Sequence, residues 1–214
     1  MTEDFYQISI IISGKLLDFT TEETTYNKYN TGTGHLLVKS EQKAQIFPIT
    51  AGKDLTKQLT ELVGSYVEIT GAVRNYRCNE EKYNVVRVYS ATKLEEDTSV
   101  NSVQATCEVV GLMTKPGSHN KASIKTAQVY LLTNEKYDKH TRLNAVIFGT
   151  NDTPLSVAAL PTLGTLYTFK GYLQLDKASQ KPAQLTSREI GDAVEGKIEL
   201  VITDLKQTKQ NEKQ

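Results

Sequence analysis

Tyrosine residues alternate with lysine and arginine in two polar stretches in the first half of this 214-residue chain. The first stretch holds Tyr26, Lys28 and Tyr29, and the second holds Arg74, Tyr76, Arg77, Lys82 and Tyr83. A phenol ring offers a flat face to a nucleobase, and each stacked base contributes about 1–3 kcal/mol, while a neighbouring cation can contact a phosphate. The chemistry that these residue types support is reversible binding of unpaired nucleic acid.

Groups that could do catalysis or hold a metal are scattered along the chain. Two cysteines, Cys78 and Cys107, cannot make a structural zinc site alone. The run Gly32-Thr-Gly34 is followed by a predicted strand rather than a helix, so it does not fit a phosphate-binding loop. No histidine has a cysteine or an acidic partner at ligand spacing: His35, His119 and His140. We expect no enzyme activity, no cofactor and no metal.

The composition adds weaker expectations about partners and compartment. Lys plus Arg and Asp plus Glu both number 25, so phosphate binding would depend on local grooves rather than on a global field. No apolar run approaches the roughly 18 residues of a membrane span, and the acidic start MTEDFYQ does not resemble a signal peptide. We expect a cytoplasmic protein with free thiols.

A short pattern occurs twice, one hundred positions apart. The segment GSYVEITG (64–71) recurs as GTLYTFKG (164–171), each a pair of glycines around six β-prone residues. Such a repeat predicts one small fold built twice. We expect a first domain over 1–97, a second over 98–195, and an extra strand with a disordered tail over 196–214.

The first copy predicts three strands, a helix and two further strands. Gly14 interrupts the first strand and suggests a bulge or bend. Asp54 is expected to cap a helix that Gly64 ends, with an apolar stripe of Leu55, Leu59 and Leu62. On the strand that follows, Val67, Ile69 and Val73 are expected to face inward. The expected segments are a strand over 5–19, a loop over 20–34, two strands within 35–50, a strand over 66–73, a loop over 75–83 and a strand over 84–94.

The second copy predicts the same order. Residues 103–109 alternate at period two, which puts Val103, Ala105, Cys107 and Val109 on one face, and Gly111 is expected at the place of Gly14. The remaining expectations are a loop over 115–125, two strands around NEKYDKH, a helix from Pro154, a strand over 166–173, a fifth strand over 183–190 and an extra strand over 197–205.

This element order is that of the OB-fold, a five-stranded Greek-key barrel, here with one short helix per repeat. The segments LNAVIFG (143–149), LGTLYTFKGYL (163–173) and VGSYVEITGAV (63–73) resemble those of bacterial and phage single-stranded DNA-binding proteins. The two-barrel chain is similar to the Deinococcus–Thermus form, which dimerises to bring four barrels together. The replicative family ends in an acidic tip finishing in Pro-Phe, whereas this chain ends NEKQ, which favours a phage, plasmid or accessory protein.

The resemblance implies a groove across the second and third strands of each barrel, flanked by the loops that join strands 1 to 2 and 4 to 5. Phe47 also suits a barrel core, and for Tyr167 and Phe169 the core is favoured. The second copy has fewer aromatic candidates in its loops, so phosphate contact or assembly could dominate there. The candidate DNA-binding residues are Tyr26, Lys28, Tyr29, Lys39, Phe47, Arg74, Tyr76, Arg77, Tyr83, Arg87, Tyr89, Lys121, Lys125, Tyr130, Phe148, Lys170, Tyr172 and Lys177.

The favoured hypothesis is that the chain coats single-stranded DNA without sequence specificity, in replication, recombination or repair. Two alternatives stay open: a protein–protein adaptor of a replication or conjugation complex, and a single-stranded RNA binder. Replication or recombination proteins are expected partners, and a homodimer is expected to form if residues 197–205 pair along a barrel edge.

Overall fold

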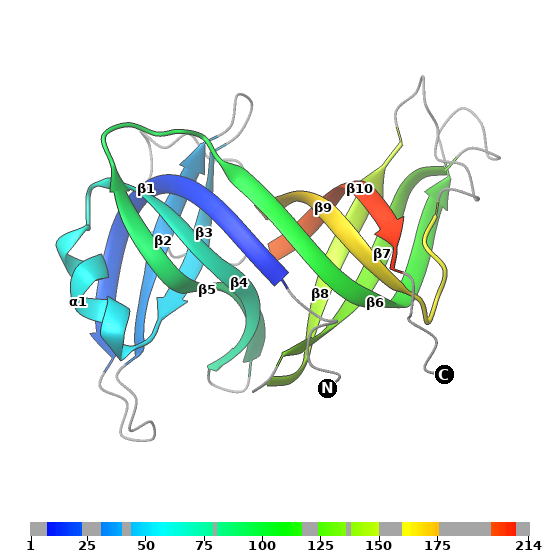
Figure 1. The fold of residues 1–214 in the computed structure, drawn as a ribbon, viewed down its shortest axis with the longest axis horizontal. Helices are drawn as coiled ribbons and strands as arrows, with labels where there is room; N and C mark the ends of the chain where they lie inside the picture. The colour runs from blue at the N-terminus through cyan, green and yellow to red at the C-terminus, as the bar shows by residue number, and fades with distance from the viewer. Residues whose placement is uncertain are drawn as a thin grey trace. The chain divides into compact units, whose positions relative to one another are not determined.

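The computed structural model describes residues 8–22, 31–39, 44–78, 81–116, 124–135, 138–149, 160–175 and 198–208. These residues divide into two compact units, one built on Ser9–Ser102 and the other on Val103–Leu173 with the strand that follows Glu199. Both units consist of β-strands, and a single short helix occurs among the described residues. The structure therefore confirms an all-β chain built from two small barrels, which Figure 1 shows with their strands labelled.

The first barrel is closed by five strands in the order β1-β2-β3-β5-β4-β1. The pair β3–β5 is parallel, and the pairs β1–β2, β2–β3, β1–β4 and β4–β5 are antiparallel. This is the strand order of an OB-fold. Its elements are β1 (Ile8–Glu22), β2 (Thr31–Lys39), β3 (Ala44–Ala51), α1 (Lys53–Glu61), β4 (Tyr66–Cys78) and β5 (Glu81–Leu94).

The second barrel closes in the same way, in the order β6-β7-β8-β10-β9-β6, and its pair β8–β10 is parallel like β3–β5. Its strands are β6 (Asn101–Pro116), β7 (Ile124–Glu135), β8 (Asp138–Phe148), β9 (Leu166–Leu175) and β10 (Ile198–Gln207). The segment expected as an extra strand thus forms β10 and lies between β8 and β9, where β5 lies in the first barrel. Most of the helix expected from Pro154 and all of the strand expected over 183–190 lie outside the described residues.

The place of β10 bears on the expected homodimer. β10 lies between β8 and β9, and its residues Glu199–Val201 pair with β8. A strand can add a second chain only along an edge whose backbone groups are unpaired. Residues 199–201 are therefore not a free edge, and pairing of a second copy along this strand stays a prediction.

The two copies of the glycine pattern have the same backbone hydrogen bonds. The Gly64 amide donates to the Leu16 carbonyl at 2.7 Å, and the Gly164 amide donates to the Val109 carbonyl at 2.8 Å. Both glycines have positive φ, +84° and +71°, which a residue with a side chain rarely adopts. The repeat in the sequence is therefore a repeat of one turn, and it makes Leu16 and Val109 equivalent.

This equivalence shows that Gly111 does not take the place of Gly14. Gly14 pairs with Val67 and Cys107 pairs with Tyr167, so Cys107 holds the position of Gly14. The expected match was wrong because each strand has a bulge after the equivalent position, at Leu17 and Val110, and Gly111 lies just beyond the second. Gly14 does not mark the bulge either. A Cβ on Gly14 would lie 2.3 Å from the Leu37 carbonyl oxygen, so the glycine permits a close approach of β1 and β2.

Inward-facing residues follow the predicted alternation. Val67, Ile69 and Val73 are buried on β4, and Val103, Ala105, Cys107 and Val109 are buried on β6, as expected. The expected loop over 75–83 is instead a continuation of β4 and β5, whose pairing runs to Cys78 and Glu81. The backbone of residues 75–78 is paired with that of residues 81–84, which local composition did not reveal.

Helix α1 lies at one end of the first barrel, where it contacts β2, β3 and β5 (Figure 1). Its N-cap is Gly52 rather than the expected Asp54. Asp54 lies in the first turn, where the positive end of the helix dipole stabilises a carboxylate. Leu59 from the predicted apolar stripe is fully buried. The helix thus covers the core next to Gly52, the residue that joins β3 to α1.

Candidate nucleic-acid interface

Strand alternation identifies the outward side chains on the first three strands of each barrel. In the second barrel Ala127, Val129 and Ala145 are buried, so their sequence neighbours on β7 and β8 point outward. Register then places residues of the same side next to one another across β6, β7 and β8: Lys115 with Thr126 and Phe148, Met113 with Gln128 and Val146, and Gly111 with Tyr130 and Asn144. Of these, Val146 is buried. We call these nine residues the β6–β8 face.

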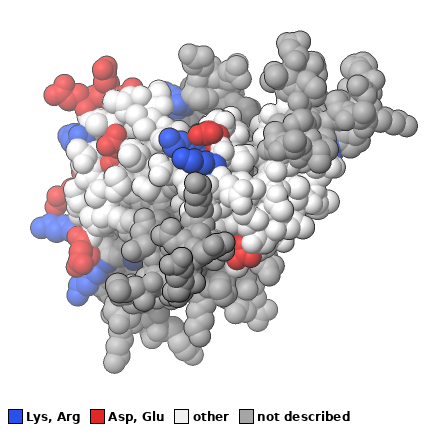
Figure 2. Space-filling view, turned by 45° about the vertical axis from the view of Figure 1, so that its right-hand side comes forward, with Lys and Arg blue, Asp and Glu red and all other residues white. Residues whose placement is uncertain are grey.

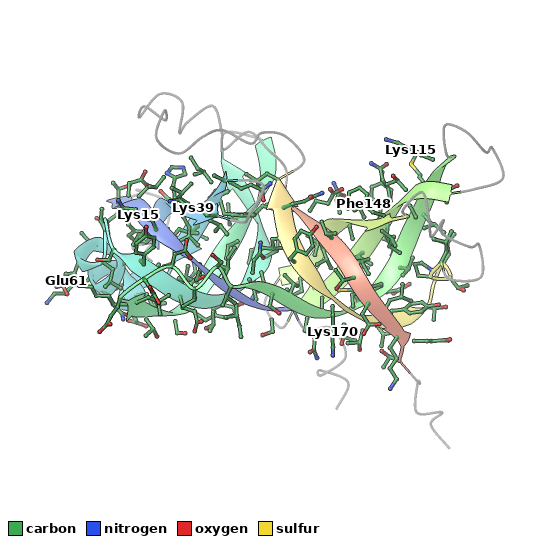
Figure 3. All side chains as sticks on the ribbon, turned by 90° about the horizontal axis from the view of Figure 1, so that it is seen from above. Lys15, Lys39, Glu61, Lys115, Phe148 and Lys170 are labelled. Carbon is green, nitrogen blue, oxygen red and sulfur yellow. The ribbon has the colours of Figure 1, made fainter. Side chains whose placement is uncertain are left out.

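The β6–β8 face exposes large apolar side chains. Phe148 is 52% exposed and Met113 is 57% exposed, and both are among the most exposed large hydrophobic residues of the described chain. Lys115, which is also exposed, lies in the same row as Phe148. Figure 3 shows the labelled Lys115 and Phe148 on the same side of this barrel. An aromatic ring and a cation are therefore neighbours on an accessible surface.

Tyr130 is held against the backbone of Gly111. A Cβ on Gly111 would lie 2.8 Å from the Tyr130 Cδ2 atom, so the ring occupies the space that a larger residue would fill. The Tyr130 hydroxyl donates to the Met113 Sδ atom at 3.6 Å. These two contacts hold the ring against β6. Tyr130 is a candidate in the sequence, whereas Gly111 and Met113 are not, because only the register brings all three together.

The corresponding face of the first barrel has different chemistry. Where the second barrel has Gly111 and Tyr130, the first has Asp18 and His35, and the His35 Nδ1 atom lies 2.8 Å from the Asp18 Oδ1 atom. Two outward aliphatic residues, Leu37 and Ile46, are buried and pack with Leu17 and Ala44. Lys15 and the predicted Lys39 are exposed on β1 and β2 (Figure 3).

Phe47 does not lie on the outward face. Its exposure is 0%, and it pairs with Leu36, which is also fully buried. The side chain belongs to the barrel core because its parity on β3 is that of Ile49. Phe47 is therefore removed from the candidate interface, and Tyr167 and Phe169 are core residues too, as the sequence favoured.

Arg74, Tyr89 and Arg87 form a cluster on the outward side of β4 and β5. The Arg74 Nη2 atom donates to the Tyr89 hydroxyl at 2.9 Å, and Tyr89 is 51% exposed. Burial lowers the pKa of Arg87, Tyr89 opposes this change, and the charge of Arg74 lowers the pKa further. All three residues were candidates in the sequence, and the structure brings them together.

The other candidates divide into three groups. Lys170 and Tyr172 are exposed on β9, and Figure 3 shows Lys170 on the side of the barrel away from Phe148. Five candidates lie outside the described residues: Tyr26, Lys28, Tyr29, Lys121 and Lys177. Four lie on described strands whose side chains at those positions are not described: Tyr76, Arg77, Tyr83 and Lys125.

Positive and negative side chains lie near one another on the face in Figure 2. Among the described residues visible there, Lys and Arg lie beside Asp and Glu and do not form one continuous basic area. Within the described ranges, no group of three His, Cys, Asp or Glu residues could hold a metal ion. No helix in the same ranges is long and apolar enough to span a membrane.

Solved structures with the same architecture include the single-stranded DNA binding protein from Thermus aquaticus. That structure gives a TM-score of 0.70 at 11% sequence identity, covering 98% of this chain and 96% of its own. A deletion mutant of the same protein gives a TM-score of 0.66 at 12% identity, covering 96% of each chain. No family model and no curated protein matches this sequence. The comparison confirms the resemblance in fold, two OB-fold barrels in one chain.

Proposed function

We propose that this chain binds single-stranded DNA without sequence specificity. The observation that carries the proposal is the β6–β8 face, where the exposed Phe148 ring and the fixed Tyr130 ring accompany Lys115. The similarity in fold to the Thermus aquaticus protein supports the same function.

The chemistry of this face suits a flexible strand of any sequence. Every base has a π-face, so stacking on Phe148 and Tyr130 would contribute about 1–3 kcal/mol per base whatever the base is. Tyr130 is held by Gly111 and Met113, so little side-chain freedom is lost when a base stacks on it. Because net charge is zero, affinity depends on these local contacts rather than on long-range attraction.

We further propose that the chain acts by covering DNA in the cytoplasm during replication, recombination or repair, as an accessory protein of a phage or plasmid. Stacked and contacted bases cannot pair with a second strand, so the mechanism is stoichiometric. Replication or recombination proteins and a second copy of the chain remain proposed partners.

A protein–protein adaptor is the second candidate. The observations that favour it are the zero net charge of the chain and the Asp18–His35 pair on the outward side of the first barrel. A carboxylate on this surface repels phosphate. An adaptor predicts a partner protein instead of a nucleic acid.

Titration of oligo(dT) of about 35 nucleotides, followed by tyrosine emission at low and high salt, tests the proposal. We expect binding that weakens as salt rises because counterions are released. Phe148→Ala should weaken binding roughly tenfold or more, whereas Phe148→Tyr should retain it because the ring remains.

Three outcomes of this titration separate the alternatives. The absence of binding at low salt would reject DNA binding and leave the adaptor. Equal affinity of Phe148→Ala and the unchanged chain would remove the β6–β8 face from the interface. Competition by oligo(rU) as strong as that by oligo(dT) would favour the hypothesis that the chain binds single-stranded RNA.

A further inference from the structure

The Arg74–Tyr89–Arg87 cluster has no counterpart at the equivalent positions of the second barrel. A Cβ on Gly71 would meet the Arg87 carbonyl oxygen, and a Cβ on Gly171 would meet that of Val201. Arg87 and Val201 are therefore equivalent, and the same register puts Thr203 at the place of Tyr89 and Gln174 at the place of Arg74. The cluster is a property of the first barrel alone.

The Arg87 guanidinium lies where the second barrel has an aromatic ring. Thr50 pairs with Arg87 and Val146 pairs with Val201, so two residues further along, Gly52 is equivalent to Phe148. A Cβ on Gly52 would lie 2.9 Å from the Arg87 Nη2 atom. At the same point of the fold, one barrel presents a phenyl ring and the other a guanidinium.

The electrostatics of the cluster favour an anion. Arg87 is partly buried, and the charge of Arg74 acts on it. No carboxylate among the described residues forms a salt bridge with Arg87. Burial and the charge of Arg74 both disfavour the charged form of Arg87, as the lowered pKa indicates. An anion bound between the two guanidinium groups would relieve both effects, and the guanidinium fork matches phosphate oxygens.

We infer that Arg87 and Arg74 bind a phosphodiester of the single strand, with Tyr89 orienting Arg74. In this inference the second barrel stacks bases on Phe148 and Tyr130, and the first barrel binds the phosphodiester backbone of the DNA. This inference rests on the proposed function and adds a site of defined ligand chemistry to it.

The salt dependence of oligo(dT) binding distinguishes the two contributions. For single strands, each phosphate contact contributes about 0.7 to the slope of log K against log salt concentration. Arg87→Gln should reduce the slope by about 0.7, while Phe148→Ala should lower affinity and leave the slope unchanged. Lys57→Gln is the matched control, since this helix residue is 90% exposed and its loss removes the same charge from the same barrel.

Two further measurements keep the outcome clear. An oligonucleotide with uncharged methylphosphonate links should bind the unchanged chain and Arg87→Gln equally, and a difference between them would point to a base contact instead. Urea unfolding of Arg87→Gln should match the unchanged chain, which separates a lost contact from a damaged barrel. An unchanged salt slope in a folded Arg87→Gln variant overturns the inference.

Inorganic phosphate tests the site without DNA. Excess phosphate should shift the arginine side-chain N–H resonances of Arg87 and Arg74 in nuclear magnetic resonance spectra of the full chain. If oligo(dT) does not bind but these signals shift, the proposed function fails and the anion site stands. If oligo(dT) binds and the signals do not shift, the proposed function stands and the anion site fails.

Discussion

At the scale of single residues, two glycines decide what each barrel presents to solvent. Gly111 gives the Tyr130 ring room to lie against β6, and Gly52 gives the Arg87 guanidinium room beside β3. Neither position needs a left-handed backbone; each is a glycine because a neighbouring side chain fills the space. The proposed binding groups are therefore positioned by residues that carry no chemistry of their own.

Replacing Gly111 with alanine tests this dependence. The new Cβ would lie 2.8 Å from the Tyr130 ring, so the ring must move away from its place. We expect several-fold weaker oligo(dT) binding and a loss of stability of about 1–3 kcal/mol from the forced contact. A double-mutant cycle with Tyr130→Ala measures the coupling. Once the ring is gone, Gly111→Ala should have no further effect on binding, and a second full loss would refute the mechanism.

At the scale of elements, the turn before β4 and the turn before β9 are the same structure. Each places a positive-φ glycine whose amide bonds the first strand of its barrel, at Leu16 or Val109. This bond ties the start of one strand to the middle of another, which is how the barrel closes at that corner. The bulges at Leu17 and Val110 follow directly and turn each first strand toward its second partner.

Alanine at Gly64 or Gly164 should destabilise the respective barrel by about 1–2 kcal/mol. Nothing lies within 4 Å of a Cβ added at either site, so the cost comes from the backbone conformation alone. Asparagine, which tolerates this conformation better, should cost less. Urea unfolding of the four variants checks the prediction. Equal stability of an alanine variant and the unchanged chain would contradict the shared-turn interpretation.

At the scale of the whole molecule, one barrel architecture occurs twice with unlike surfaces. The first carries Arg87, Arg74 and a carboxylate at Asp18, and the second carries Phe148, Tyr130 and Lys115. The sequence predicts the richer site in the first copy because its loops interleave tyrosine with cations. That prediction is untested, because the side chains of those tyrosines are not among the described ones. Among the residues that the structure describes, the aromatic face belongs to the second copy.

The stability of the whole chain should fall with pH above about 9 because of Cys107. Burial raises the pKa of this thiol from 9.0 to about 12. The unfolded chain then releases a proton that the folded chain keeps, so the contribution of this group is complete below pH 9.0 and is lost as pH rises toward 12. Unfolding in urea between pH 7 and about 10.5 measures this loss.

The matched pair for that experiment is Cys78→Ser and the same variant with Cys107→Ala. Other titrating groups are common to both chains, so their difference isolates Cys107. Stability of the two variants should converge as pH rises above 9, and a constant difference would show that Cys107 does not titrate as a buried thiol. Ellman's reagent should likewise react with Cys107 only as the chain unfolds.

The sequence by itself determined the repeat, the strand order of the first barrel and part of the core. The paired glycines, the alternation at Val103–Val109 and the leucine stripe of α1 are local patterns, and local patterns report periodicity and turn chemistry directly. They correctly gave two barrels and the burial of Val67, Ile69 and Cys107.

Only the tertiary structure decided which side chains meet. Phe47 is core because of strand parity relative to Leu36, and Tyr130 meets Gly111 and Met113 because bulges set the register of β6. The fifth strand of the second barrel is β10, the segment expected as an extra strand. It has this place because it pairs with β8 and β9 and so closes the barrel. Register and closure are non-local, and a one-residue shift moves every side chain to the other face of the sheet.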